Sequence, residues 1–281
     1  MIAFKDVCFS YRRNVPVLSN LSLQIEPGTV CGLLGRNGVG KSTMLYLTAG
    51  LLRPRSGQVL CNGYIPSDRQ VNFLNDIFIV PEEFDLPPIS LDEYVRINSV
   101  FYPKFNLDLM HSILEIFALP GNINLGALSL GQKKKAFLSF ALACNTSILL
   151  LDEPTNGLDI TAKRMFRAAI SAAMTDDKTI IISTHQVYDV ENILDHVVIA
   201  DNNRILLNRP MIGIQTKLRF GYTQDPEQAK RALFSIPMPG GFNVVEFLDN
   251  PDRETEVNLE TLFELTNSNP DLINQLFVEK S

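Results

Sequence analysis

The sequence has no tryptophan, only four cysteines and more acidic than basic residues. Its formal net charge of −6 gives no sign of a broad basic face, so we expect no nucleic-acid partner. The N-terminal stretch, MIAFKDVCFSYRRN, lacks the apolar h-region of a signal peptide. No CxxC pair occurs, which disfavours a disulfide framework or a zinc site and indicates free thiols in a reducing compartment at Cys8, Cys31, Cys61 and Cys144.

Long apolar runs are also missing. The longest uncharged stretch extends from Ala136 to Leu151 and contains the polar run Asn145 to Ser147, whereas a membrane-spanning helix needs about 20 apolar residues. We therefore expect that any membrane role of the chain is peripheral. Hydrophobic residues make up 46% of the chain and charged residues 20%, which is typical of a globular protein with one large domain or one domain plus an appendage.

Strand and helix patterns alternate over residues 1–210. The N-terminal segments around residues 2–9 and 18–25 alternate apolar and polar residues as antiparallel strands do. Continuous apolar runs recur further on, in TVCGLLG, SILLLDEP and KTIIISTH. Such runs between helices are typical of a parallel sheet covered on both faces. Residues 82–145 show mainly helical spacing, so we predict an α/β core into which a helical subdomain is inserted.

Residues 211–281 differ in character and are predicted to form an accessory region. Acidic residues outnumber basic ones there. The segments QAKRALFSI and NLETLFELT are expected to be helices, and FNVVEFL a strand between them. Apolar residues remain too frequent for a disordered tail, so we predict a small α+β appendage.

The motif GRNGVGKS at residues 35–42 fits the pattern GxxxxGK[ST] and lies between a buried strand and a helix. Glycines are needed there because backbone N–H groups must wrap phosphate oxygens without side chains in the way. Lys41 would place a positive charge on the β- and γ-phosphates, and Ser42 would offer a hydroxyl to Mg²⁺. The expected ATP-binding residues here are Gly35, Asn37, Gly38, Gly40, Lys41, Ser42 and Thr43.

The run ILLLDE at residues 148–153 predicts a buried strand that delivers carboxylates at its carboxyl end, where α/β sheets bind ligands. Asp152 would hold Mg²⁺, and Glu153 would be the general base for the attacking water. Together with the glycine-rich loop, this strand predicts a P-loop NTPase core of the RecA-like type, with an antiparallel β subdomain at the N-terminus.

The stretch LSLGQKKKAFLSFALACNTSILLLDEPTNGLD resembles the part of ABC ATPases that joins their signature, Walker B and D-loop motifs. Residues 128–132 resemble the LSGGQ signature and precede Asp152 by about twenty residues. The tripeptide ending in His185 resembles the switch-histidine loop, and Tyr11 resembles the aromatic residue that stacks on adenine. The resemblance covers roughly residues 1–210, with its elements in the family's order.

This resemblance implies an ATP-hydrolysing subunit that works as a homodimer or as a heterodimer with a second ATPase. Lys41, Glu153 and His185 would be catalytic, and Ser129 and Gly131 would complete the site of the opposite subunit. The resemblance further implies an integral membrane permease as partner and a cytoplasmic, peripheral location on the inner face of the cell membrane. VPEEF and SLGQKKK are similar to ATPases paired with multidrug or antibiotic-export permeases, which favours export.

Two positions depart from the family pattern. Leu130 replaces the first glycine of the signature, and Glu82 stands where many members have a glutamine that helps to hold Mg²⁺. These departures leave open a catalytically weak regulatory subunit. A separate alternative is a soluble ABC ATPase of a non-transport machine. The run Lys133 to Lys135 is most often a solvated helix face, although it could also meet the membrane partner.

Overall fold

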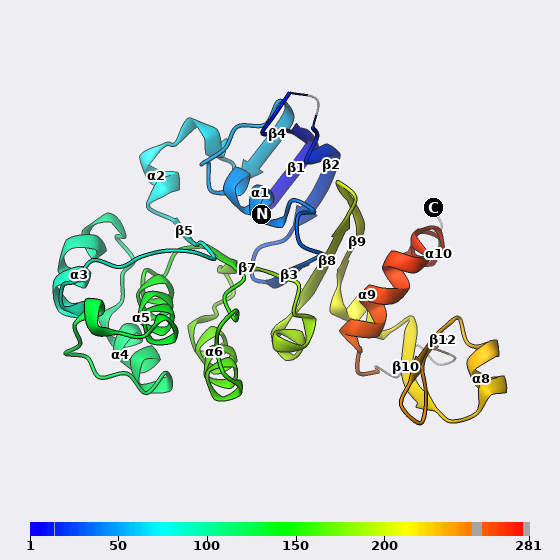
Figure 1. Cartoon of the computed structure of the whole chain (residues 1–281). Helices are drawn as coiled ribbons and strands as arrows, with labels where there is room; N and C mark the ends of the chain where they lie inside the picture. Colours follow the sequence, from blue (N-terminus) through cyan, green and yellow to red (C-terminus); the bar gives the residue numbers. More distant parts are fainter. Residues whose placement is uncertain (14, 249–254, 278–281) are drawn as a thin grey trace.

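The computed structural model describes residues 1–13, 15–248 and 255–277, and at its centre lies a six-stranded sheet (Figure 1). The strand order is β5-β6-β7-β3-β8-β9, in which the first five strands are parallel and β9 runs antiparallel to β8. All residues of β3, β6 and β7 are buried, as expected for apolar strands covered on both faces. The strand bounds are β3 Val30–Leu34, β5 Ile77–Val80, β6 Ile148–Asp152, β7 Thr179–Thr184, β8 His196–Asp201 and β9 Arg204–Pro210.

A separate three-stranded antiparallel sheet is built from the N-terminal part of the chain in the order β2-β1-β4. Strand β2 alternates buried and exposed residues, and its buried residues share an apolar cluster with helix α1. Met44 and Leu45 of α1 share one apolar cluster with Leu23 of this sheet and Leu33 of the central sheet, so α1 joins the two sheets. The bounds are β1 Ile2–Phe9, β2 Leu18–Ile25, β4 Ser56–Cys61 and α1 Lys41–Thr48, followed by the short helix α2 Val71–Leu74.

Three helices connect β5 to β6 and form the group at the lower left of Figure 1. Each is preceded by a residue whose side chain accepts a hydrogen bond from a first-turn N–H, which explains where each helix begins: Ser90, Asn106 and Ser129. The helices are α3 Leu91–Asn98, α4 Leu107–Ile116 and α5 Leu130–Ala143, and α6 Ile160–Ala173 then leads from β6 to β7. The predicted helical insertion within the α/β core is thus observed.

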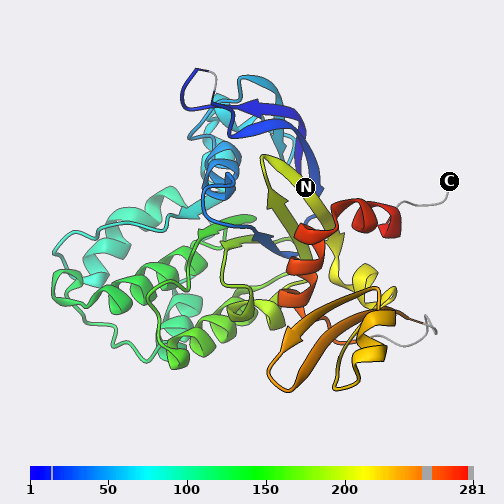
Figure 2. The ribbon, with the colours of Figure 1, turned by 45° about the vertical axis from the view of Figure 1, so that its right-hand side comes forward.

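The accessory region contains a three-stranded antiparallel sheet in the order β10-β12-β11. Helix α9 contacts this sheet and also β8 and β9, so it lies between the accessory and central sheets (Figure 2). The elements are α7 Met211–Gln215, β10 Leu218–Thr223, α8 Pro226–Arg231, β11 Phe234–Met238, β12 Gly241–Phe247, α9 Leu259–Ser268 and α10 Pro270–Phe277. The fold class predicted from the sequence, including the α+β character of this region, is confirmed.

One helix prediction within the accessory region was wrong in its extent. The segment QAKRALFSI was expected to be helical throughout, but α8 ends at Arg231 and Ala232 is already extended. Residues 234–238 instead form β11, in which Phe234 is paired with Val245 and Ile236 with Asn243 of β12. Tertiary strand pairing therefore outweighs the local helical preference.

The scarcity of long apolar runs and of paired cysteines in the sequence can be compared with the structure. Within the described ranges, no helix has the length and hydropathy that crossing a bilayer requires. All four cysteines are free thiols, three of them buried and Cys8 partly exposed.

Candidate nucleotide site

The site is assembled where three adjacent parallel strands end. Strand β7 lies between β6 and β3, so the loops that follow these strands meet at one edge of the sheet. The loop after β3 is the glycine-rich segment 35–40, the loop after β6 begins with Glu153, and β7 is followed by His185. Carboxyl ends of parallel strands are the usual place for ligands in α/β folds.

The glycine-rich loop has the backbone that an anion site needs. Gly40, with a φ of 103°, is the residue before α1, and no side chain caps the helix. Because no acidic residue occupies the first turn either, the N–H groups there are free to bind phosphate. A Cβ atom on Gly35 would lie 2.6 Å from the carbonyl oxygen of Ala200, whereas one on Gly38 would meet nothing within 4 Å. The loop is thus packed against β8 on one side and open on the other.

Lys41 and His185 converge on one carboxylate oxygen of Glu153. The Oε1 atom of Glu153 lies 3.4 Å from Lys41 Nζ and 2.9 Å from His185 Nδ1. Lys41 Nζ also donates to the carbonyl oxygens of Gly35 at 2.8 Å and Arg36 at 3.2 Å. Lys41 and Glu153 are only 6% and 4% exposed, so the pair is shielded from solvent while His185 forms its half-open edge. The structure therefore brings the three predicted catalytic residues together.

The backbone around Asp152 and Glu153 is held by β7. Asp152 is buried, and its Oδ1 atom accepts a hydrogen bond from the hydroxyl of Ser183. The N–H of Glu153 donates to the carbonyl oxygen of Ser183 at 3.0 Å. Glu153 has a φ of 44°, in the left-handed region that non-glycine residues rarely adopt at a cost of about 1–3 kcal/mol. Such strain is often found at functional positions because the surrounding structure must enforce it.

Tyr11 and Thr43 lie beside the start of α1. The hydroxyl of Tyr11 is 3.1 Å from Thr43 Oγ1, and its ring, 57% exposed, is stacked edge-on against Phe9. On the same helix, burial raises the pKa of the Tyr46 phenol, and the nearby Asp152 carboxylate adds to this effect. The aromatic ring predicted to receive adenine is therefore exposed next to the glycine-rich loop. Ser42 is half-buried in the first turn of α1.

Glu82 reaches the loop that follows β6. Its Oε1 atom accepts a hydrogen bond of 2.9 Å from the side-chain amide of Asn156. Asn156 Oδ1 in turn accepts one of 3.0 Å from Gln186, the residue after His185. Glu82 thus belongs to a network that joins the loops after β5, β6 and β7, rather than being an isolated acid. Sequence reasoning missed Asn156 and Gln186, although both flank predicted site residues.

Ser129 and Gly131 lie apart from this group, at the beginning of α5. Ser129 Oγ accepts from the N–H of Gln132 at 3.3 Å, and Gln132 Oε1 accepts from the N–H of Ser129 at 3.0 Å. Leu130 is 68% exposed, so its side chain leaves the helix end uncovered. Across the described part of the chain, neither Ser129 nor Gly131 is hydrogen-bonded to Lys41 or Glu153. Among the described residues, the start of α5 is therefore not hydrogen-bonded to the group around Glu153.

The expectation of a solvated lysine run was wrong for its middle residue. Lys134 is 5% exposed, while Lys133 and Lys135 are half-buried. Lys134 lies one helical turn before the fully buried Leu138, so its position on α5 faces the core. The four-residue spacing to apolar positions is the signal that could have revealed this.

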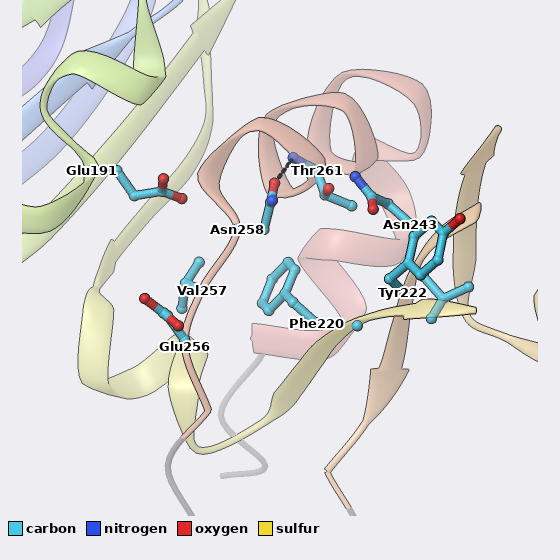
Figure 3. Close-up of a pocket in the computed structure, with 10 residues that line it drawn as sticks. Glu191, Phe220, Tyr222, Asn243, Glu256, Val257, Asn258 and Thr261 are labelled. Carbon is cyan, nitrogen blue, oxygen red and sulfur yellow. Dashed lines mark hydrogen bonds between the residues drawn. The ribbon is translucent and has the colours of Figure 1, made fainter. Parts of the chain in front are cut away.

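A hollow of about 330 Å³ lies between the accessory region and the core segment that carries Glu191 (Figure 3). Phe220 and Tyr222 of β10 line one side, while Glu191 and Glu256 approach from the other. Glu191 accepts a hydrogen bond of 2.6 Å from the N–H of Leu259, the first residue of α9. Burial raises the pKa of Glu191, and the carboxylate of Glu256 adds to this effect. None of the predicted site residues lines this hollow.

The glycine-rich loop and the contacts of Glu153 with Lys41 and His185 define a P-loop nucleotide-binding cassette. Comparison with known proteins identifies its family. The family described as ABC transporter matches residues 18–156. The Nod factor export ATP-binding protein I of Burkholderia thailandensis is 31% identical over 262 residues, which are 88% of this chain and 80% of that protein. The chain belongs to the ATP-binding subunits of ABC transporters. Members of this family are ABC-type ATPases that bind ATP, which agrees with the enzyme class predicted from the sequence.

Further relatives and structures are similar over the cassette. The Nod factor export ATP-binding protein I of Rhizobium etli is 32% identical, and the match covers 72% of this chain but slightly less than two thirds, 66%, of that protein. A relative with an import name, the methionine import ATP-binding protein MetN of Carboxydothermus hydrogenoformans, is 30% identical, with 73% of this chain and 65% of that protein covered. The solved structure of an ATP-binding subunit of an ABC transporter superposes with a TM-score of 0.68 at 25% identity, covering 76% of this chain and 92% of that chain.

Proposed function

We propose that this chain hydrolyses ATP in the presence of Mg²⁺ and uses ATP-driven dimerisation to power a separate membrane permease. The proposed direction of transport is export. The observation that carries the hydrolytic part is the contact of one buried Glu153 oxygen with both Lys41 and His185 at the mouth of the glycine-rich loop. A carboxylate in that place is suited to accept the proton of a water that attacks the γ-phosphate. His185 would orient this carboxylate, and Lys41 would stabilise the charge that develops on the phosphate.

The residues around Asp152 fit a magnesium site. Carboxylate and hydroxyl oxygens are the ligands that Mg²⁺ prefers, usually one or two from the protein with the rest from phosphates and water. Ser42, Asp152 and Glu82 would supply them, and the Ser183 hydroxyl fixes the Asp152 carboxylate without using its second oxygen. Among the residues that the structure describes, no group of three or more His, Cys, Asp or Glu side chains could hold a metal by itself. Bound Mg²⁺ would neutralise the negative charge of the phosphates.

Dimerisation is supported by the placement of Ser129 and Gly131 away from Glu153. The start of α5 is exposed and carries no acidic residue in its first turn, so it can bind the γ-phosphate held by another subunit. Apolar side chains stand exposed beside such an interface, with Leu130 at 68% and Ile160 at 89%. Burying them against a second ATPase subunit would stabilise the ATP-bound dimer.

A permease partner is supported by an apolar groove of about 440 Å³ between α2, β5 and the short turn at residues 99–102 that follows α3. Three of its lining side chains are large, apolar and strongly exposed: Leu51 at 54%, Val71 at 70% and Phe101 at 61%. Exposed apolar patches of this kind usually mark a protein interface. A short cytoplasmic helix of an integral membrane protein would fill this groove, which would place the chain on the inner face of the cell membrane.

The proposal is tested with wild type and Glu153→Gln, each with and without a multi-spanning membrane protein chosen as the candidate partner. Wild type should hydrolyse Mg²⁺-ATP, and Glu153→Gln should bind ATP but form a stable dimer in gel filtration. Equal, near-zero rates in both proteins, even with the partner present, would instead indicate a regulatory subunit. Failure of the membrane protein to co-purify would favour a non-transport machine.

A further inference from the structure

One unusual charged side chain outside the residues assigned so far is Lys134 on α5. A lysine is almost never this buried, at 5% exposed, unless its ammonium group has polar partners. Lys134 Nζ donates to the carbonyl oxygens of Asn156 at 2.9 Å and Glu153 at 3.3 Å. Over the described residues, no carboxylate lies within ion-pair distance of it. Its direct partners are therefore backbone carbonyls of the turn that carries Glu153.

This turn is strained and closes on itself. Glu153 has the left-handed backbone described above, with a φ of 44°. The N–H of Asn156 donates to the carbonyl oxygen of Glu153 at 3.2 Å. The carbonyl oxygen of Glu153 thus accepts from two donors, Asn156 and Lys134. A cation that binds both ends of the turn favours the peptide orientation in which the Glu153 side chain points at Lys41 and His185.

Electrostatics support a charged Lys134 at this place. Burial lowers the pKa of Lys134, but the carboxylates of Glu82 and Glu153 oppose this effect. Glu82 is linked to the same turn, because it accepts a hydrogen bond from the side chain of Asn156. Asn156 therefore contacts Lys134 through its backbone carbonyl oxygen and Glu82 through its side-chain amide nitrogen. The negative charge that Glu82 brings to the site is offset on the other side of the turn.

The position of Lys134 in α5 gives these contacts a role in the reaction. Ser129 caps the start of α5, which we propose to contact the nucleotide of the opposite subunit. Lys134 lies little more than one turn further along the same helix. We propose that Lys134 is a positioning residue that couples the signature helix to the general base of its own subunit by holding the turn from Glu153 to Asn156. This inference rests on the proposed role of Glu153.

The test compares three variants of the full chain with Mg²⁺-ATP. Lys134→Met removes the charge and the donors but keeps the length of the side chain. Lys133→Met is the matched control, since it removes the same charge from the same helix, where Lys133 pairs with the exposed Asp85. Lys134→Arg restores a buried cation. We expect kcat of Lys134→Met to fall by about 10- to 100-fold relative to Lys133→Met, with KM for ATP changed by less than about threefold, because a misplaced catalytic group lowers rate rather than binding. Lys134→Arg should recover part of kcat.

A second readout needs no catalysis. Amide hydrogen exchange of the peptide that covers residues 153–158 should be at least about tenfold faster in Lys134→Met than in Lys133→Met, while exchange in β1 and β2 stays unchanged. If Lys134→Met does not fold, Lys134→Gln takes its place with the same expectations. Equal kcat and equal exchange in the Lys133 and Lys134 variants would overturn the coupling, as would a loss of ATP binding in Lys134→Met. A wild type without ATPase activity would instead overturn the proposed function, and the exchange result would still decide the role of Lys134.

Discussion

The nucleotide site and the accessory region place charged groups in opposite ways. In the core, Lys41 and Glu153 are less than 10% exposed and satisfy each other, because parallel strands buried on both faces fix where their ends lie. At the accessory region, Glu256 and the core residue Glu191 line a hollow whose other wall carries Phe220. Aromatic residues there remain open, with Tyr222 at 52% exposed. A sheet covered on both faces fixes the positions of the charged side chains at its strand ends. A small antiparallel sheet with one partly open face leaves side chains beside it partly exposed to solvent.

The largest effect is expected when the central charge of the core is removed. Lys41→Met should reduce kcat by about 100- to 1,000-fold, because a preorganised cation is lost from the place where charge develops. The control is Lys104→Met, which removes a half-exposed lysine paired with Asp76. Steady-state ATPase assays of both variants check this. Equal rates would mean that the charge at Lys41 does not serve the reaction.

The two histidines His185 and His196 offer a matched pair. His185 contacts Glu153, whereas His196 is buried and hydrogen-bonded to Asn208 at 2.6 Å. We expect His185→Ala to lower kcat by about 100-fold with little change in thermal stability. His196→Ala should lower the stability by about 1–3 kcal/mol and leave kcat unchanged. Denaturant titration and ATPase rates of both variants check this. A loss of stability in His185→Ala, or a loss of kcat in His196→Ala, would contradict it.

A smaller effect is expected from packing in the accessory region. Val244 of β12 is 2% exposed and lines the hollow, so Val244→Ala should cost about 1–2 kcal/mol of unfolding free energy. Because the nucleotide site is built from other strands, kcat should stay within about twofold of wild type. A large loss of ATPase activity in the folded variant would show that the two regions are not separate.

The smallest predicted effect concerns Glu191 and pH. Since burial raises the pKa of Glu191 in the folded state, the folded protein binds the proton more tightly than the unfolded chain. Stability from this group is therefore present at acidic pH and is lost as pH rises through the ordinary glutamate range to the raised pKa. Glu191→Gln should flatten this decline in melting temperature. An unchanged pH profile would contradict the burial of this carboxylate.

The sequence was sufficient to predict the residues whose place follows from a strand. Glu153 and His185 come directly after apolar runs that form adjacent buried strands, so their meeting with Lys41 is a consequence of sheet order. The helical spacing of Lys134 from Leu138 places it on the core face of α5, but its contacts depend on how α5 packs on the turn after β6. The contact of Glu82 with Asn156 likewise joins residues 74 positions apart. The boundary of α8 was missed because pairing with β12 decides it.

The order of the strands also has a consequence for biosynthesis. The strand that carries the glycine-rich loop, β3, has as neighbours β7 and β8, so that Val30 is paired with Ile180 and Cys31 with His196. During translation its apolar segment therefore emerges long before either neighbour exists, and its backbone groups have no strand partner. The side chains of Lys41, Glu153 and His185 can therefore come together only after β7 has been synthesised.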